Sequence, residues 1–125
     1  MVRITIPCIP PTVNHYWGYR ALGRGKIRKY LTTKAKAFKN IVKKCYSGDI
    51  FKKSPDKYLC VWVFLYYGDK RKRDIDNNLK AVFDSFNNVV WEDDSQVDYL
   101  IVERKISNMK FPYTKVYVEE RDKQL

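Results

Sequence analysis

Residues 58–67 read YLCVWVFLYY, an unbroken apolar run rich in aromatic and β-branched side chains. Such a run is typical of a strand that is covered on both faces, so we expect it at the centre of a sheet. Shorter strands are predicted for residues 2–6, 97–106 and 114–118, where apolar and polar side chains alternate. The charged residues from Glu119 onward are expected to fray.

Two amphipathic helices are predicted between these strands. In residues 33–47 apolar side chains recur at helical spacing, with a threonine to cap the start and a glycine to cap the end. In residues 74–88 they recur at i, i+3, i+4 and i+7. The order of elements indicates an α+β fold, a single mixed sheet with two main helices packed on it, in one domain covering residues 1–125.

The length and composition of the chain exclude several classes of protein. With 125 residues and 45% hydrophobic side chains, the chain can form one core and is not disordered. It has neither a membrane-length apolar run nor a signal peptide, so we expect a cytoplasmic protein without a membrane partner or a nucleotide cofactor. Cys8, Cys45 and Cys60 lack metal-ligand spacing and are expected to be reduced thiols, and His15, the one histidine, excludes two-imidazole mechanisms.

The charge is unevenly distributed along the chain. Lys and Arg number 25 and Asp and Glu 14, giving a net charge of +11, yet residues 74–98 hold seven acids and one base, Lys80. A cationic run stands directly before this acidic window and consists of Lys70, Arg71, Lys72 and Arg73. The pattern indicates a nucleic-acid-binding surface interrupted by an acidic site, rather than a membrane-binding surface.

A second candidate DNA-binding region is the segment of residues 12–30, where aromatic and basic side chains are interleaved around a Gly-Arg-Gly sequence. The segment is expected to be a loop or hairpin that stacks on bases and holds phosphates, or alternatively a hairpin whose rings pack inward. The residues that would contact DNA are Asn14, Tyr16, Arg20, Arg24 and Lys26, together with the run at positions 70–73.

The acidic window contains a candidate metal site. Asp74 and Asp76 begin the second predicted helix, and Asp93 and Asp94 follow it. Carboxylates brought together repel one another unless a cation lies between them, and oxygen-only ligands favour Mg²⁺ or Mn²⁺. Such an ion would support phosphodiester hydrolysis. In the alternative interpretation Asp74 caps a helix, Asp76 pairs with Lys80, and the later acids form an ordinary turn.

Two further points concern lysines near these acids. Lys80 lies one helical turn beyond Asp76, so its ammonium is expected in or beside the acidic site, where it either holds the scissile phosphate or shields the carboxylates. Asp94 with Glu103 and Lys105 matches the D…E-x-K pattern of restriction-type nucleases. That pattern is less favoured, because too few residues separate the acid from the E-x-K strand.

These motifs resemble the RusA family of Holliday junction resolvases, small dimeric endonucleases of bacteria, prophages and phages. Residues 71–97, RKRDIDNNLKAVFDSFNNVVWEDDSQV, follow the family's R-D-x-D-N-x-x-K helix and its W-x-D-D-x-Q-V turn. Residues 10–14, PPTVN, are similar to the family's N-terminal loop. The resemblance covers essentially the whole chain.

The resemblance implies an activity and residue roles. It implies a homodimer that cuts four-way DNA junctions at two symmetry-related phosphodiesters, in recombination and repair, with Mg²⁺ or Mn²⁺. It makes Asp74, Asp76 and Asp94 the metal-binding carboxylates with Asp93 beside them, Lys80 essential, and Asn77 a supporting residue. The alternatives are a non-catalytic basic DNA-binding protein and a nuclease for other branched DNA such as flaps or forks.

Overall fold

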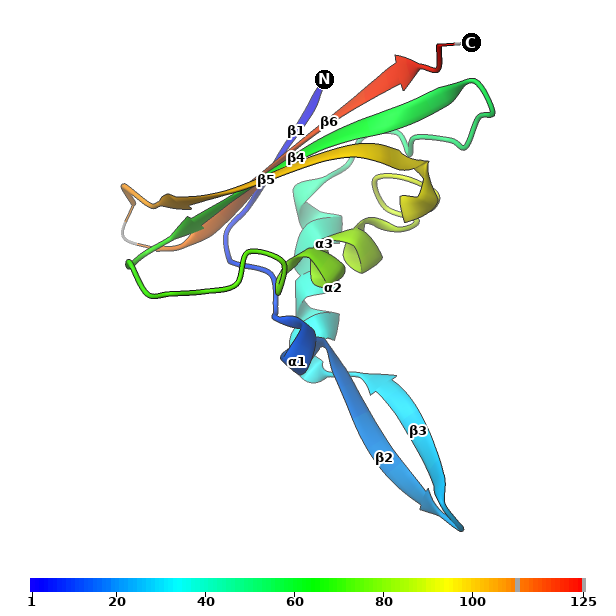
Figure 1. Cartoon of the computed structure of the whole chain (residues 1–125), viewed down its shortest axis with the longest axis vertical. Helices are drawn as coiled ribbons and strands as arrows, with labels where there is room; N and C mark the ends of the chain where they lie inside the picture. Colours follow the sequence, from blue (N-terminus) through cyan, green and yellow to red (C-terminus); the bar gives the residue numbers. More distant parts are fainter. Residues whose placement is uncertain (110, 125) are drawn as a thin grey trace.

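Four strands form the main sheet, in the order β1-β6-β4-β5 (Figure 1). The computed structural model describes residues 1–109 and 111–124, apart from the side chains of Asn14 and Tyr16. The strands are β1 (Val2–Ile6), β4 (Lys57–Tyr67), β5 (Val97–Ile106) and β6 (Tyr113–Asp122). Strand β6 pairs antiparallel with both β1 and β4, whereas β5 pairs parallel with β4, so the predicted mixed sheet is confirmed.

Strand β4 lies inside the sheet, as its apolar sequence predicts, and its alternate side chains form the floor of the core. Leu59, Val61, Val63 and Leu65 are all buried on the side that faces the helices. Figure 1 shows every helix on this one side of the sheet. The prediction that β4 is covered on both faces is therefore wrong.

The other side of the sheet, which we call the open sheet face, carries aromatic rings that cover one another. Trp62 lies against Tyr99, Phe64 against Tyr117 and Tyr66 against Tyr113, with ring centroids 5.7, 5.5 and 4.3 Å apart. These contacts shield the rings of β4 from water, so the rings are half-buried although the helices lie on the other side of the sheet. An unbroken apolar sequence therefore arises here from one helix-covered face and one aromatic face.

Helices α2 (Thr33–Cys45) and α3 (Leu79–Phe86) pack on the helix side of the sheet. Thr32 caps α2, and its hydroxyl accepts a hydrogen bond from the Ala35 amide at 3.2 Å. This helix ends at Cys45 because Tyr46 is extended, before the predicted glycine cap. Among the residues described, no helix has the length and apolar character needed to cross a membrane.

The predicted helix over residues 74–88 is shorter than expected and begins at Leu79. Residues 74–78 instead form turns, in which the Asn77 amide donates to the Asp74 carbonyl and the Leu79 amide to the Asp76 carbonyl. Asp and Asn favour such turns over a helix interior. Asp74 and Asp76 therefore precede the helix rather than belonging to it.

The end of the chain is more ordered than its charge suggests. Strand β6 runs to Asp122, and Lys57 of β4 pairs with Asp122 across the ladder, with Nζ and Oδ1 2.8 Å apart. The prediction that residues beyond Glu119 fray is therefore wrong through Asp122, because β4 extends equally far beside them.

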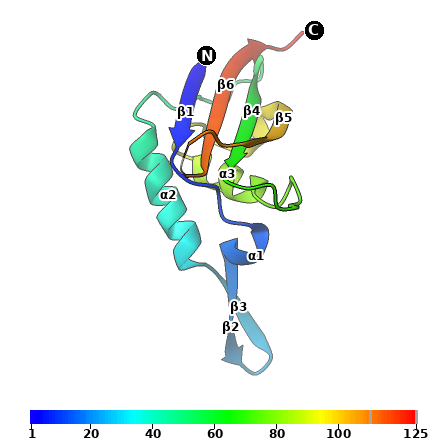
Figure 2. The ribbon, with the colours of Figure 1, turned by 90° about the vertical axis from the view of Figure 1, so that its left-hand side faces the viewer.

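A hairpin projects from the helix side of the molecule (Figures 1 and 2). It consists of β2 (Trp17–Gly23) and β3 (Lys26–Leu31), and the short helix α1 (Val13–Tyr16) leads into it. At its tip Gly23, Arg24 and Gly25 have φ angles of 79°, 51° and 73°, so the glycines allow a turn that other residues rarely adopt. The hairpin predicted within residues 12–30 is confirmed.

Candidate active site

The turn before α3 presents two carboxylates to solvent. Asp74 and Asp76 are both exposed. The turn is fixed to α1, because the Val13 amide donates to the Asn77 carbonyl at 2.8 Å. The Asn77 side chain is half-buried beside Asp74 and lines the same cavity. The three residues predicted to act together at positions 74, 76 and 77 thus lie on one anchored turn.

Asn78 anchors that turn to two other segments. Its side chain is buried; its Nδ2 donates to the Pro10 carbonyl at 2.6 Å, and its Oδ1 accepts from the Tyr67 hydroxyl at 2.8 Å. Burial raises the pKa of Tyr67, which keeps its hydroxyl protonated as a donor. Sequence reasoning missed both Tyr67 and Asn78, although an Asn-Asn pair directly before an apolar helix face was a signal that one amide is buried.

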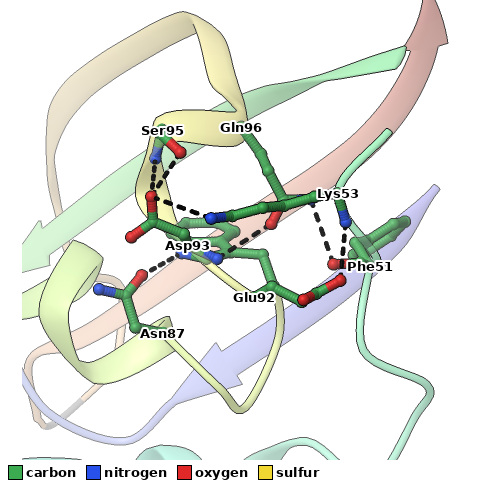
Figure 3. A network of polar contacts seen from close by, with 8 residues as sticks. Phe51, Lys53, Asn87, Glu92, Asp93, Ser95 and Gln96 are labelled. Atoms are coloured by element: carbon green, nitrogen blue, oxygen red, sulfur yellow. Dashed lines mark hydrogen bonds and ion pairs between the residues drawn. The ribbon is translucent and has the colours of Figure 1, made fainter. Parts of the chain in front are cut away.

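The second acidic segment lies after α3 and is organised by a polar network (Figure 3). Glu92 accepts a hydrogen bond from the Lys53 amide at 2.8 Å. Asp93 accepts hydrogen bonds from the amide and hydroxyl of Ser95, which lower its pKa, and its carboxylate lies 3.9 Å from Lys53 Nζ. Gln96 completes a capping box with Asp93. Glu92 and Asp93 are therefore used to fix this segment, and Asp93, predicted beside the metal ligands, has a capping role.

Asp94 starts the short 3-10 helix η1 (Asp94–Gln96), and its side chain is half-buried. Of the ion pairs in the described residues, none uses Asp74, Asp76 or Asp94. In a chain with 25 Lys and Arg, three predicted ligands without a cationic partner are chemically free to bind a metal ion.

The carboxylates do not form a closed cage. Across residues 1–109 and 111–124 no group of three or more His, Cys, Asp or Glu side chains is close enough to hold a metal ion. The predicted convergence of four aspartates on one point is thus absent from the described residues. The carboxylate oxygens themselves are the ligand type that Mg²⁺ prefers. Mg²⁺ commonly takes only one or two protein carboxylates and completes its shell with water and substrate phosphate.

Lys80 lies on the first turn of α3 and is exposed. Its Nζ lies 3.2 Å from Asp84 Oδ2, one helical turn further on, and 5.9 Å from the centroid of the Trp17 ring. The alternative pairing of Lys80 with Asp76 is absent from the ion pairs found in the described part of the chain. A surface pair of this kind contributes little stability and exchanges readily for another anion.

The cationic run before the turn is only partly free. Arg73 pairs with Asp69 at 2.8 Å and lies over the Tyr67 ring, and Arg71 lies 3.7 Å from the same Asp69 carboxylate, whose pKa these contacts lower. Lys70 and Lys72 are exposed and take part in none of the ion pairs found in the residues described. The two lysines are therefore the members of the run that are free to bind phosphate.

The hairpin places more cations at a distance from the turn. Arg20, Arg24 and Lys26 are exposed, and Arg20 lies directly opposite Arg28 in the β2–β3 ladder. Like charges placed directly opposite one another repel, so this pairing suits a polyanionic ligand. The side chains of Asn14 and Tyr16, predicted to bind DNA, lie outside the described residues.

The restriction-type pattern is not assembled. Glu103 and Lys105 pair with each other at 3.3 Å, and their register places them beside Phe64 and Tyr66 on the open sheet face. Asp94, the acid of this pattern, precedes the start of β5, whereas Glu103 and Lys105 lie near the other end of that strand. Asp94 and the E-x-K residues are thus separated by most of the length of β5.

Comparison with known proteins identifies the family. Residues 7–119 match the family described as Endodeoxyribonuclease RusA. The protein belongs to the RusA endodeoxyribonuclease family. It is also similar to a curated relative from Enterobacteria phage 82, named crossover junction endodeoxyribonuclease rusA, with 29% identity over 107 residues that cover 84% of each chain. The family resemblance predicted from the sequence motifs is confirmed.

The match to the RusA family includes every residue proposed above for the site. It extends from before the Pro10 contact to β6 and therefore includes the turn at 74–78, the segment around Asp94 and the hairpin. The acidic turn thus lies within an endodeoxyribonuclease fold, and its exposed carboxylates are the best candidates in that fold for phosphodiester chemistry.

Proposed function

We propose that the chain is a structure-selective endonuclease that resolves four-way DNA junctions by metal-dependent hydrolysis, in DNA recombination and repair. The observation that carries the proposal is the pair of exposed carboxylates, Asp74 and Asp76, on a turn anchored by buried Asn78 and flanked by free lysines. The name of the phage relative, crossover junction endodeoxyribonuclease rusA, supports the junction as substrate. A DNA substrate of this kind places the activity in the cytoplasm of a bacterial or phage-infected cell.

Asp74, Asp76 and Asp94 would hold Mg²⁺, for which Mn²⁺ would substitute, with water and substrate phosphate completing the shell. Because the three carboxylates are not close enough to hold an ion together in the described structure, binding of the ion would have to draw them together. All three offer only oxygen ligands and are free of cationic partners in the part of the chain that the structure describes. The bound ion would supply activation of a water molecule and stabilisation of the charge that develops on the phosphate. Asp93 is left out of the ligand set because its carboxylate caps η1 and accepts hydrogen bonds from the amide and hydroxyl of Ser95.

The cationic side chains would bind and orient the DNA. Lys70, Lys72 and the hairpin arginines neutralise backbone phosphates on either side of the turn. Lys80, held only by Asp84, would exchange that partner for the scissile phosphate. Asn77 would orient a carboxylate of the turn or its water, since it lines the same cavity as Asp74.

Two cuts require two active sites, and we propose that the second site comes from a homodimer formed through the open sheet face. An uncovered face rich in Tyr, Trp and Phe has the composition of an interface core. It also carries both signs of charge, because Glu103 pairs with Lys105 and Glu119 with Arg121. A second copy related by a two-fold axis can therefore meet complementary charges on the same face.

Analytical ultracentrifugation of Tyr117→Glu tests this interface. The substitution places a charge among the packed rings of the open sheet face and is expected to lower the dimer mass toward that of the monomer. Tyr19→Glu, on the hairpin and 65% exposed, is the control and is expected to leave the mass unchanged. A Tyr117→Glu protein with the mass of the wild-type dimer, or a wild-type protein that is monomeric throughout, would contradict this interface.

The catalytic proposal is tested with labelled four-way junctions and a matched linear duplex. Wild-type protein is expected to make paired nicks across the junction with Mg²⁺ or Mn²⁺ and none with EDTA. Asp74→Asn is expected to lose cleavage by about 10²-fold or more while keeping DNA binding. Asp98→Asn removes an exposed acid of the same window outside the turn and is expected to cut like the wild type.

The alternatives give different results in the same assay. A non-catalytic basic DNA-binding protein would bind the junction with strong salt dependence and cut nothing with any divalent ion. A nuclease for other branched DNA would cut flaps or forks faster than the four-way junction. Equal cleavage by Asp74→Asn and the wild type would show that the acidic turn is not the active site.

A further inference from the structure

A cavity of about 840 Å³ opens beside the acidic turn. Its apolar wall is formed by Pro10 and Pro11, before α1, and by Ala37, Phe38 and Ile41 of α2. Asp74, Asn77 and Asn78 also line it and supply polar groups. The size lies within the range of cavities that bind small organic groups, and the mixture of apolar walls with a few polar groups is typical of them.

We propose that this cavity holds one unpaired nucleobase of the DNA strand that is cut. The inference rests on the proposed function, because it takes the scissile phosphate to lie at Asp74. Asp74 is part of the cavity rim, so a nucleotide adjoining that phosphate is the group brought closest to the opening. A nucleobase has flat apolar faces and polar edges, which match the proline and helix walls and the asparagine side.

The charges around the rim favour the same ligand. Lys34, Lys72 and Arg73 all line the cavity, and they suit the phosphates on either side of an inserted nucleotide. An apolar metabolite without phosphates would leave these cations unused. The rim therefore indicates a base that arrives on a phosphodiester backbone.

Buried groups hold parts of the cavity wall in place. Phe38 in its wall is 2% exposed, and the Tyr67–Asn78–Pro10 hydrogen bonds fix the two chain segments that bound it. A pocket whose walls are already fixed loses little conformational entropy when the base enters.

This pocket would explain selectivity for branched DNA. Taking a base out of a continuous duplex costs free energy, and the cost is lower where pairing or stacking is already broken. At a branch point the continuous stacking of the duplex is interrupted, whereas a linear duplex binds the basic surface without delivering a base. Binding would then require only phosphate contacts, whereas cleavage would also require a base in the pocket.

The test uses four-way junctions that carry the fluorescent base 2-aminopurine at each position flanking the cut, with EDTA present so that binding is measured without cleavage. Wild-type protein is expected to raise the fluorescence at one position severalfold, because the base leaves the stack there. Ala37→Trp fills the cavity from an exposed position of α2 and should abolish this rise. Asn40→Trp, exposed on the same helix and outside the cavity, should retain it.

The rate of junction cleavage gives the second readout. One of its two experiments changes the DNA substrate and needs no protein variant. With Mg²⁺ present, Ala37→Trp is expected to cut junctions about 10-fold or more slowly than Asn40→Trp while binding them equally well. An abasic nucleotide at the responding position should slow the wild-type protein by a similar factor. This experiment stands even if Ala37→Trp fails to fold.

The outcomes separate this inference from the function it rests on. Absence of a fluorescent response at every flanking position, or an equal response with Ala37→Trp and Asn40→Trp, would overturn the base pocket even if junctions are cut normally. Failure of the wild type to cut any junction would overturn the proposed function, while a position-specific fluorescence rise would still support base capture.

Discussion

Replacing Tyr67 by Phe removes one hydroxyl from the network that holds the acidic turn. Tyr67 is 7% exposed and Asn78 4%, so neither side chain has ready access to water as a replacement partner. The change leaves the Asn78 Oδ1 without its 2.8 Å donor, and an unsatisfied buried acceptor costs about 1–3 kcal/mol. For a chain of this length the melting temperature should fall by about 3–10 °C.

Asn78→Ala should cost more, because it removes both hydrogen bonds and leaves the Tyr67 hydroxyl and the Pro10 carbonyl without partners. We expect a loss of about 2–5 kcal/mol in the free energy of unfolding. The two substitutions act on one contact, so the double variant should be less destabilised than their sum by about 0.5–3 kcal/mol. Urea unfolding followed by tryptophan fluorescence measures all three variants.

Tyr66→Phe is the matched control for this cycle. Tyr66 precedes Tyr67 on β4 but points to the open sheet face, where it stacks on Tyr113 and its hydroxyl is in none of the hydrogen bonds found for the described residues. Its loss should change the free energy of unfolding by less than about 0.5 kcal/mol. Equal effects of Tyr66→Phe and Tyr67→Phe, or full additivity of Tyr67→Phe with Asn78→Ala, would refute the reasoning.

Three further predictions concern groups around the site. Alkylation of Cys8 and Cys45 should be slow at neutral pH and accelerate above pH 9.0, because burial raises both thiol pKa values; mass spectrometry follows it, and a flat pH profile would contradict it. The hydrogen bond from Arg73 lowers the pKa of Asp69, so this contact stabilises the fold above pH 3.8 and is lost as the pH falls through the lowered value; an NMR titration midpoint at or above 3.8 would count against it. Thr32→Ala removes the cap of α2 and should lower the free energy of unfolding by about 1 kcal/mol in urea, whereas no loss would show that the cap is not needed.

Local pattern was sufficient for much of the fold. The apolar run on β4 and the helical spacing on α2 place these elements nearly where the structure has them, because each pattern is repeated over ten or more residues. The start of α3 was mispredicted, since the apolar stripe begins at Leu79 while the preceding Asp and Asn residues form turns. The uncovered side of the sheet was also missed, because an aromatic run does not reveal which layer covers it.

Some residues of the candidate site could be predicted from the sequence and others could not. The motif predicts Asp74, Asp76 and Asp94 as ligands; the structure puts the first two on one turn and Asp94 at the start of η1. The capping box of Asp93 with Gln96 is local and was passed over, whereas Asn78 could not be assigned because its partners come from β4 and the loop before α1. Long-range contacts of this kind leave no periodic signal in the sequence.

The distribution of ion pairs explains how three acids stay available in so cationic a chain. The first 48 residues contain 11 of the 25 Lys and Arg and none of the 14 Asp and Glu, so any exposed carboxylate nearby would attract a cationic partner.

Other acids take up the cations that lie closest to the site. Asp69 pairs with Arg73 and Arg71, and Asp84 pairs with Lys80. Asp93 does the same for Lys53 beside the second acidic segment. Asp93 adjoins Asp94 in sequence, and Asp69 precedes Asp74 by five positions, while Asp84 lies one helical turn beyond Lys80. Because these acids pair with the nearby cations, the carboxylates at positions 74, 76 and 94 have no cationic partner among the ion pairs of the described residues and are available to a divalent cation.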